Sequence, residues 1–177
     1  MLIYGYSILE LGAISIASER ILSSLRYSAL ANFNMRDEFM HDDLFRFCEQ
    51  FILNIMAKQY PNIEFDIERV TECIMRFSPQ NIALVFDNLI SNSDKSHSTR
   101  ILIRLIQENK KHIIQYSDNG TGFGDDEDMS RIFEFGWSST GGTGIGMYNV
   151  KRAVERMRGT IVGSKNAPKG AMFTIEV

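Results

Sequence analysis

The sequence is poor in the features that define several large classes of protein. It has two cysteines, Cys48 and Cys73, whose spacing matches neither a metal motif nor a disulfide framework, and this favours a reducing cytoplasm. Basic residues are not in excess, because the formal net charge is -3, so the charge balance gives no reason to expect a nucleic acid partner. What remains is an ordinary globular composition.

Long hydrophobic runs are also missing. The N-terminal stretch MLIYGYSILELGAISIASER is apolar, but Glu10 interrupts it, and the chain contains no apolar run of the roughly 18 residues that predict a membrane span. No basic leader with a cleavage site is visible. With 177 residues the chain can build one hydrophobic core and a short appendage.

The hydrophobic pattern predicts an α+β fold. Residues 6–31 have helical spacing and predict an amphipathic helix, either lying on the domain or serving as a dimerisation arm. The elements expected next are an edge strand at 33–40, a helix capped by Asp42 or Asp43 and ending near Lys58, strands at 61–67 and 70–78, a helix at 80–95 opened by Pro79, two strands within 99–120 joined at 108–111, a loop at 119–142, a helix ending at Gly159, and a closing hairpin.

The order of these elements decides between two architectures. Because strands follow one another directly in places, we expect helices on one face of a mixed, mainly antiparallel sheet rather than a doubly wound parallel sheet. A loop as long as 119–142 inside a compact domain is typical of a functional lid or of a disordered segment.

The first polar motif lies in the helix at 80–95, in the stretch FDNLISNSDKS. Asn88, Asn92 and Lys95 share one helix face by their spacing of four and three. An asparagine oxygen can ligate Mg²⁺, and a lysine can meet a phosphate as a point charge. The alternative is a helix that carries polar residues near its end. The buried stripe of the same helix is expected to contain Leu84, Val85, Leu89 and Ile90.

The second motif is YSDNGTGFG, at the end of an apolar strand. Asp118 at the rim of a sheet can accept a hydrogen bond from an exocyclic amine such as that of adenine. Gly120 and Gly122 allow the backbone to turn sharply and to approach a flat ligand closely. The alternative is an ordinary turn, since Asn-Gly is a common turn signal.

The third motif is GGTGIGMYNVK, directly before a helix. Bare backbone N–H groups at Gly142, Gly144 and Gly146, together with the positive end of the helix, can hold phosphates. Met147 replaces the lysine that a P-loop needs after its last glycine, and the glycine spacing does not match the dinucleotide-binding fingerprint. The alternative is a flexible linker.

Taken together and in this order, the three motifs resemble the GHKL superfamily of ATP-binding domains, most closely the catalytic ATP-binding domain of bacterial sensor histidine kinases. NLISNSDKS is similar to the N box of that family, DNGTG to its G1 box, RIFEFGWSS to its F-box region, and GGTGIGMYNVKRAVERMRGTI to its G2 box with the following helix. With KGAMFTIEV as the closing strand, the resemblance covers about residues 34–177 and implies a Bergerat-type sandwich of helices over a mixed sheet.

The resemblance also implies roles for individual residues. Asn92 would ligate the Mg²⁺ that bridges the ATP phosphates, Asn88 and Lys95 would lie beside those phosphates in the catalytic centre, and Asp118 would read the adenine amine. Further residues implied to line the base pocket and the phosphate tail are Gly120, Gly122, Gly142, Thr143, Gly144, Ile145 and Gly146.

Other positions carry further implications of the family pattern. Ala171 departs from the pattern, since several relatives have a threonine there, so no adenine contact is assigned to it. The aromatic residues expected to pack the lid against the body when nucleotide is bound are Phe133, Phe135 and Trp137.

Residue 88 distinguishes kinds of ATP-dependent protein. Superfamily members that activate water typically have a glutamate at the position of Asn88, and an amide cannot replace that carboxylate as a base. Phosphoryl transfer to a nucleophile brought from elsewhere needs mainly alignment and charge neutralisation, so a protein histidine kinase is favoured. The alternatives are an ATP-driven conformational switch without phosphotransfer and an anti-sigma-type serine kinase.

The phosphoacceptor is expected outside this chain. His41 lies within the region that resembles the ATP-binding domain, and His97 and His112 are explained as ordinary surface histidines. We therefore expect residues 1–33 to be the remnant of a dimerisation hairpin, with residues 34–177 as the ATP-binding domain. The implied setting is a homodimeric parent protein in the cytoplasm, or the cytoplasmic part of a membrane-anchored sensor, that acts indirectly on a response regulator.

Overall fold

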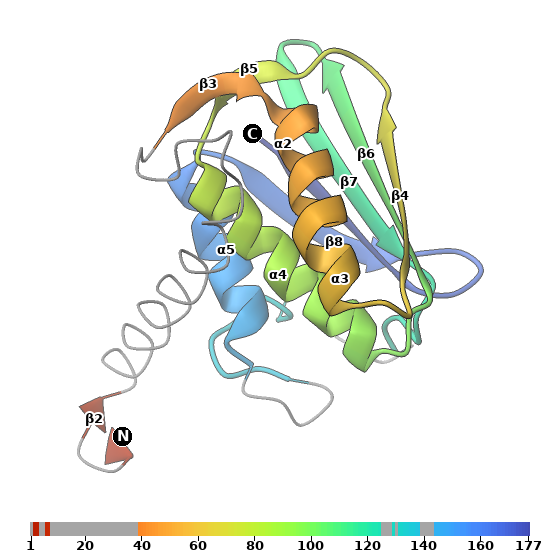
Figure 1. Cartoon of the computed structure of the whole chain (residues 1–177). Coiled ribbons are helices and arrows are strands. Elements are labelled where there is room, and N and C mark those ends of the chain that lie inside the picture. Colours follow the sequence, from red (N-terminus) through yellow and green to blue (C-terminus); the bar gives the residue numbers. More distant parts are fainter. Residues whose placement is uncertain (1, 4–5, 8–38, 125–128, 130, 139–143) are drawn as a thin grey trace.

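The computed structural model describes residues 2–3, 6–7, 39–124, 129, 131–138 and 144–177 (Figure 1). Their helices and strands are β1 (Leu2–Ile3), β2 (Tyr6–Ser7), β3 (Met40–Asp43), α2 (Leu44–Phe51), η1 (Ile52–Met56), α3 (Ala57–Gln59), β4 (Glu64–Arg69), β5 (Ile74–Phe77), α4 (Pro79–Lys95), β6 (Arg100–Glu108), β7 (Lys111–Asp118), α5 (Gly146–Arg156), β8 (Thr160–Lys165) and β9 (Ala171–Glu176).

The main sheet has five strands in the order β4-β6-β7-β9-β8. β4 pairs with β6 in parallel, and the other three pairings are antiparallel. The helices α2, α4 and α5 lie on the same side of this sheet (Figure 1). The expectation of an α+β fold with a mixed, mainly antiparallel sheet is therefore confirmed.

The two faces of the sheet follow from alternation along its strands. In β6, Ile101, Ile103 and Leu105 are buried, whereas Arg100 and Arg104 are exposed. A strand whose side chains alternate between burial and solvent covers a core with one face only. The buried face packs against the helices (Figure 1). This two-layer arrangement places the C-terminal end of β7 and the N-terminal end of α5 beside the C-terminal half of α4.

Helix α4 begins and ends where local chemistry predicts. Ser78 is its N-cap and accepts from the backbone N–H of Asn81, and Pro79 occupies the first turn, where a missing N–H does no harm. The four residues predicted for its buried stripe are all buried, which confirms that prediction. Beyond Lys95, His97 has a positive φ of 57° and ends the helix.

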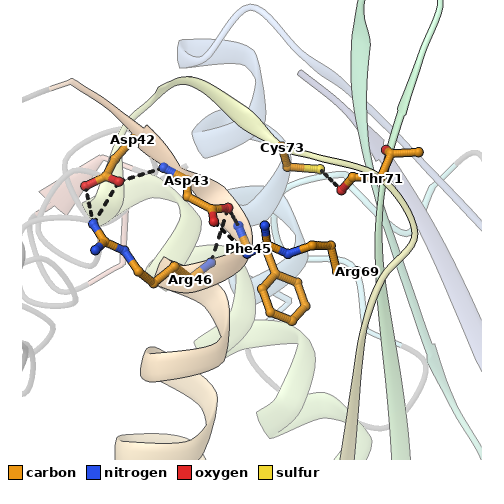
Figure 2. A network of polar contacts seen from close by, with 7 residues as sticks. All are labelled: Asp42, Asp43, Phe45, Arg46, Arg69, Thr71 and Cys73. Carbon is orange, nitrogen blue, oxygen red and sulfur yellow. Dashed lines mark hydrogen bonds and ion pairs between the residues drawn. The ribbon is translucent and has the colours of Figure 1, made fainter.

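A polar network fixes the junction of β3 and α2 at the opposite end of the domain (Figure 2). Asp43 caps α2 by accepting from the backbone N–H groups of Phe45 and Arg46, as the sequence predicts, and it also pairs with Arg69 at 2.6 Å. The Arg69 guanidinium lies 4.4 Å from the centre of the Phe45 ring. A cap of this kind contributes about 1 kcal/mol to stability.

Two element predictions near the N-terminus differ from the structure. Tyr6–Ser7 pairs with Leu2–Ile3 as a strand instead of starting a helix, and the rest of the predicted helix lies outside the described residues. The strand predicted at 33–40 is observed at Met40–Asp43, with residues 33–38 outside the described part. Its register is set by pairing with β5, a distant contact that the local pattern does not contain.

The residue that ends α5 also differs from the prediction. Gly159 was predicted as the C-terminal cap, but the residue with the left-handed backbone is Arg158, with a φ of 61°. Gly159 is required for a different reason: a Cβ on it would lie 2.3 Å from the carbonyl oxygen of Glu176. Among the helices that the structure describes, none combines the length and apolar character needed to cross a bilayer.

Candidate functional site

The polar face of α4 meets the start of α5. Asn88 Nδ2 donates to the carbonyl oxygen of Leu84 at 2.9 Å, and Asn88 Oδ1 faces Gly146, where an added Cβ would lie only 2.8 Å from that oxygen. Asn92 and Lys95 follow on the same face by helical spacing, half-buried and exposed respectively. The first and third sequence motifs are thus adjacent in the structure.

Asp118 lies at the end of β7 and is held by the protein on both carboxylate oxygens. It is 4% exposed. Oδ1 accepts from the backbone N–H of Gly120 at 2.9 Å and of Ala171 at 3.2 Å, while Oδ2 accepts from the Ser93 hydroxyl at 2.7 Å. Ser93 belongs to α4, so the second motif is tied directly to the first.

The glycine after Asp118 permits close packing against the end of α4. A Cβ on Gly120 would lie 2.8 Å from the carbonyl oxygen of Ser96, and that oxygen accepts from the backbone N–H of Thr121. Gly120 therefore has no room for a side chain because of the end of α4, and the close approach to a flat ligand that the motif predicts stays a prediction.

The main chain of Asp118 is covered by the turn between β8 and β9. Asn166 Nδ2 donates to the Asp118 carbonyl oxygen at 2.8 Å, and a Cβ on Gly170 would lie 1.8 Å from the same oxygen. Gly122 has a φ of 68° and lies against the Gly170 carbonyl. The turn thus contacts the main chain of Asp118, whereas α4 contacts its side chain.

The three motifs share one helix as their common support. Ser93 contacts Asp118 and Asn88 faces Gly146, and these two helix positions are separated by about 8 Å along the axis, from a rise of 1.5 Å per residue. Asn92 lies between them. Asn92 and Asp118 are therefore on the same side of the molecule, since Ser93, the neighbour of Asn92, contacts Asp118 directly. This placement is compatible with one ligand shared by both residues.

The region of the predicted lid is anchored at Gly144. The backbone N–H of Gly136 donates to the Gly144 carbonyl oxygen at 3.1 Å, and the Phe135 ring meets the Tyr148 ring edge-on with centroids 5.2 Å apart. Phe133 and Trp137 are half-buried against the core. The predicted site residues Gly142 and Thr143 lie outside the described residues, and Ile145 precedes α5 directly.

On the expectation that the third motif holds phosphates, replacing Gly144 by alanine should weaken ATP binding about tenfold, because this residue has a φ of 65° and an added Cβ would lie 2.3 Å from the carbonyl carbon of Gly136. Gly136 is a matched control, since it has a φ of 77° but nothing within 4 Å of an added Cβ. Calorimetric titration of both variants with ATP should show a smaller loss for G136A, and equal losses would contradict the steric argument.

Sequence reasoning missed four residues that shape the site: Ser93, Tyr116, Asn166 and Gly170. Ser93 follows Asn92 directly, and Tyr116 shares a strand face with Asp118 because the two are two positions apart. Both are polar groups at buried positions, which is the signal that could have identified them. Asn166 and Gly170 lie in the turn between β8 and β9, and the pairing of β9 with β7 brings this turn to Asp118.

The histidines and cysteines lie away from this site or have ordinary surroundings. His41 pairs across the strands with Arg76, just before α4, and Asn92 lies about 20 Å further along that helix. Burial lowers the pKa of His112 and raises the pKa of Cys48 and Cys73, so both thiols are unreactive. No cluster of three metal-ligating His, Cys, Asp or Glu side chains occurs in the described part of the chain.

A comparison with protein families matches residues 78–177, which contain all the motifs above, to the family described as "Histidine kinase-, DNA gyrase B-, and HSP90-like ATPase". Among curated proteins, a probable C4-dicarboxylate sensor kinase of Bacillus subtilis is 34% identical over 103 residues, which cover 54% of this chain and 19% of that protein. Sensor protein BceS of Halalkalibacterium halodurans is 31% identical over 101 residues, covering 53% of this chain and 30% of BceS. The chain thus matches less than a third of the length of either relative.

Solved structures show the same fold. The catalytic domain of histidine kinase ThkA superposes with a TM-score of 0.68 at 21% identity, covering 80% of this chain and 97% of that domain. Mycobacterial sensor histidine kinase MprB gives a TM-score of 0.65 at 22% identity, covering 78% of this chain and 97% of that chain. The fold expected from the sequence resemblance is therefore confirmed.

Proposed function

The chain belongs to the family of histidine kinase-, DNA gyrase B- and HSP90-like ATPases, and on that basis we propose that it binds Mg-ATP and donates the γ-phosphoryl group to a histidine on a separate dimerisation segment. The observation that carries the proposal is the amide at position 88. Asn88 Oδ1 faces Gly146, at the junction where the phosphate-binding motif meets α4.

Asp118 is the residue proposed to bind the adenine base. With Asp118 as a carboxylate, its oxygens only accept hydrogen bonds, and an exocyclic amine offers the N–H that a ring carbonyl does not. The glycines around it pack closely against protein backbone, and this packing supports the segment that carries the carboxylate. A nearly buried acid at the rim of a sheet suits recognition of one amine in a mostly apolar pocket.

The phosphates are proposed to lie along α4 towards the N-terminus of α5. Gly144 and Ile145 precede α5 and Gly146 is its first residue, so their backbone N–H groups lie at the positive end of the helix, which favours an anion. Asn92 offers a neutral amide oxygen for Mg²⁺, and Lys95 a positive charge, on the same helix face. When bound, Mg²⁺ would neutralise part of the charge on the transferring group.

The amide at position 88 separates a kinase from a water-activating ATPase. Its nitrogen donates to the Leu84 carbonyl oxygen, which leaves the amide oxygen directed towards α5. Neither the amide nitrogen nor the amide oxygen can take a proton from water near neutral pH. Asn88 would therefore position the bound phosphates and would not act as a base. These residues therefore suit phosphoryl transfer to a nucleophile supplied by another segment better than transfer to water.

The proposal includes the wider setting of the domain. Residues 34–177 would form the ATP-binding domain, and residues 1–33 would belong to a dimerisation segment in a homodimeric parent protein. The phosphoryl group would pass on to a response regulator in the cytoplasm. His41 does not serve as the acceptor in the same domain, because the length of α4 separates it from Asn92.

The test is incubation of this chain with γ-labelled ATP and a histidine-bearing dimerisation segment. Acid-labile, base-stable label on the histidine is the expected result. ATP binding without any transfer would instead support a conformational switch, and acid-stable label on a partner's serine would support a serine kinase. Either outcome would overturn the histidine kinase proposal while leaving ATP binding intact.

A further inference from the structure

A chain of three buried polar side chains lies beneath the proposed base site. The Ser93 hydroxyl is 2.7 Å from Asp118 Oδ2 and also 2.7 Å from the Tyr116 hydroxyl. Ser93 is 1% exposed and Tyr116 is fully buried. These groups come from α4 and β7, and none of them was assigned a function by the motifs except Asp118.

The direction of this hydrogen-bond chain follows from proton counting. A carboxylate only accepts, so the single hydroxyl proton of Ser93 must point to Asp118 Oδ2. Ser93 is then left to accept from Tyr116. Burial raises the pKa of Tyr116 well above its usual value, so its phenol keeps the proton that it donates. The chain runs from Tyr116 through Ser93 to Asp118.

The acceptor capacity of Asp118 is then nearly used up. Oδ1 accepts two backbone N–H groups and Oδ2 accepts Ser93, so within the described part of the chain one of about four lone-pair positions remains, on Oδ2. That single position accepts one N–H group. A ring carbonyl would place an oxygen against it and be repelled.

We propose that Ser93 is a specificity-determining positioning residue: its hydroxyl fixes Asp118 Oδ2 as a single, directed acceptor for the exocyclic amine of a purine. The inference rests on the proposed ATP-binding function and adds a residue to it. Ser93 does not touch the base. It acts by preventing rotation of the carboxylate and by excluding water from the second position on Oδ2.

The test compares ATP with purine riboside triphosphate, which lacks the 6-amine. In S93A the affinity for ATP should fall about tenfold, since a hydrogen bond to a charged group is lost, while the affinity for the amine-free analogue should change much less. The preference for ATP therefore shrinks. Ser98→Ala is the control, because this buried hydroxyl shares its one proton between the Asn119 side-chain oxygen and the Arg100 carbonyl oxygen and has no hydrogen bond to Asp118.

A second pair of variants separates specificity from stability. Tyr116→Phe keeps the bond from Ser93 to Asp118, so it should retain the preference for ATP within about threefold. S93A leaves the buried Tyr116 hydroxyl without its acceptor, which should lower the melting temperature. The double variant S93A/Y116F removes both hydroxyls of that hydrogen bond, so the melting temperature should recover while the preference for ATP over the amine-free analogue stays lost.

The possible failures are distinguishable. If the unmodified chain binds neither nucleotide, the proposed function fails and the inference fails with it. If the unmodified chain prefers ATP and S93A keeps that preference, only the role of Ser93 is wrong. If the preference returns together with stability in the double variant, Ser93 has a structural role alone, which also overturns the inference.

Discussion

Asp118→Asn is expected to reduce the affinity for ATP about a hundredfold, because it places an N–H₂ group where the base presents its own donor. The asparagine oxygen can still accept from the backbone of Gly120 and Ala171, so the fold should persist. Its nitrogen would donate to Ser93, which would reverse the hydrogen-bond chain and leave the Tyr116 hydroxyl without an acceptor, at a cost of about 1–3 kcal/mol. Calorimetry and thermal unfolding measure the two effects separately.

The same variant should change which purine is preferred. Inosine triphosphate has a carbonyl in place of the 6-amine, and a donor at position 118 can serve it, so its affinity should fall less than that of ATP. Asp94→Asn is the matched control, because it removes the same charge at an exposed position on α4. An ATP affinity within about threefold of the unmodified protein in D118N would contradict the assigned base contact.

Asn92→Ala is expected to reduce the affinity for Mg-ATP about a hundredfold while leaving the fold intact. Within the described residues the Asn92 side chain makes no hydrogen bond, and alanine is the better helix former, so stability should not fall. Titration with Mg-ATP, followed by a melting curve of the same sample, gives both numbers.

Removal of magnesium makes the test of Asn92 specific. In the presence of a chelator the unmodified chain and N92A should bind ATP with similar, weaker affinity, since the ligand to the metal no longer contributes. Ser91→Ala, one position earlier on α4, controls for a change of side chain on that helix and should bind Mg-ATP normally. A loss in N92A that persists in chelator would show that Asn92 acts on the nucleotide by another route.

Much of the fold was predictable because its signals are local. Ser78 and Pro79 mark the start of α4, and the apolar stripe of that helix needs only the helical period to be found. The position of β3 was not predictable in the same way, because Met40–Asp43 is defined by pairing with β5, and α2, η1, α3 and β4 lie between these two strands in the chain. A local sequence pattern contains only the secondary-structure propensity and the hydrophobic period of a segment. Pairing with a distant strand can override both of them.

In the candidate site, too, residues with a local sequence signal were predicted, and residues that depend on long-range contacts were missed. The motifs predicted the glycines at 120, 122, 144 and 146 as ligand contacts, and the structure shows a further constraint at each of them, a close approach of protein backbone or of the Asn88 amide oxygen. The Ser93–Tyr116 pair was missed because it depends on how β7 docks against α4. Whether the predicted residues bind nucleotide as proposed stays a prediction that the variants above test.

The position of β9 between β7 and β8 has a consequence for how the protein is made. The ribosome delivers Asn88 and Asp118 before Ala171, whose backbone N–H donates to Asp118 Oδ1. A nascent chain that has not reached this residue contains Asn88 and Asp118 but lacks one of the two backbone N–H groups that hold Asp118 Oδ1. On the proposed function, tight binding of ATP by a nascent chain would therefore require that synthesis has passed the hairpin of β8 and β9.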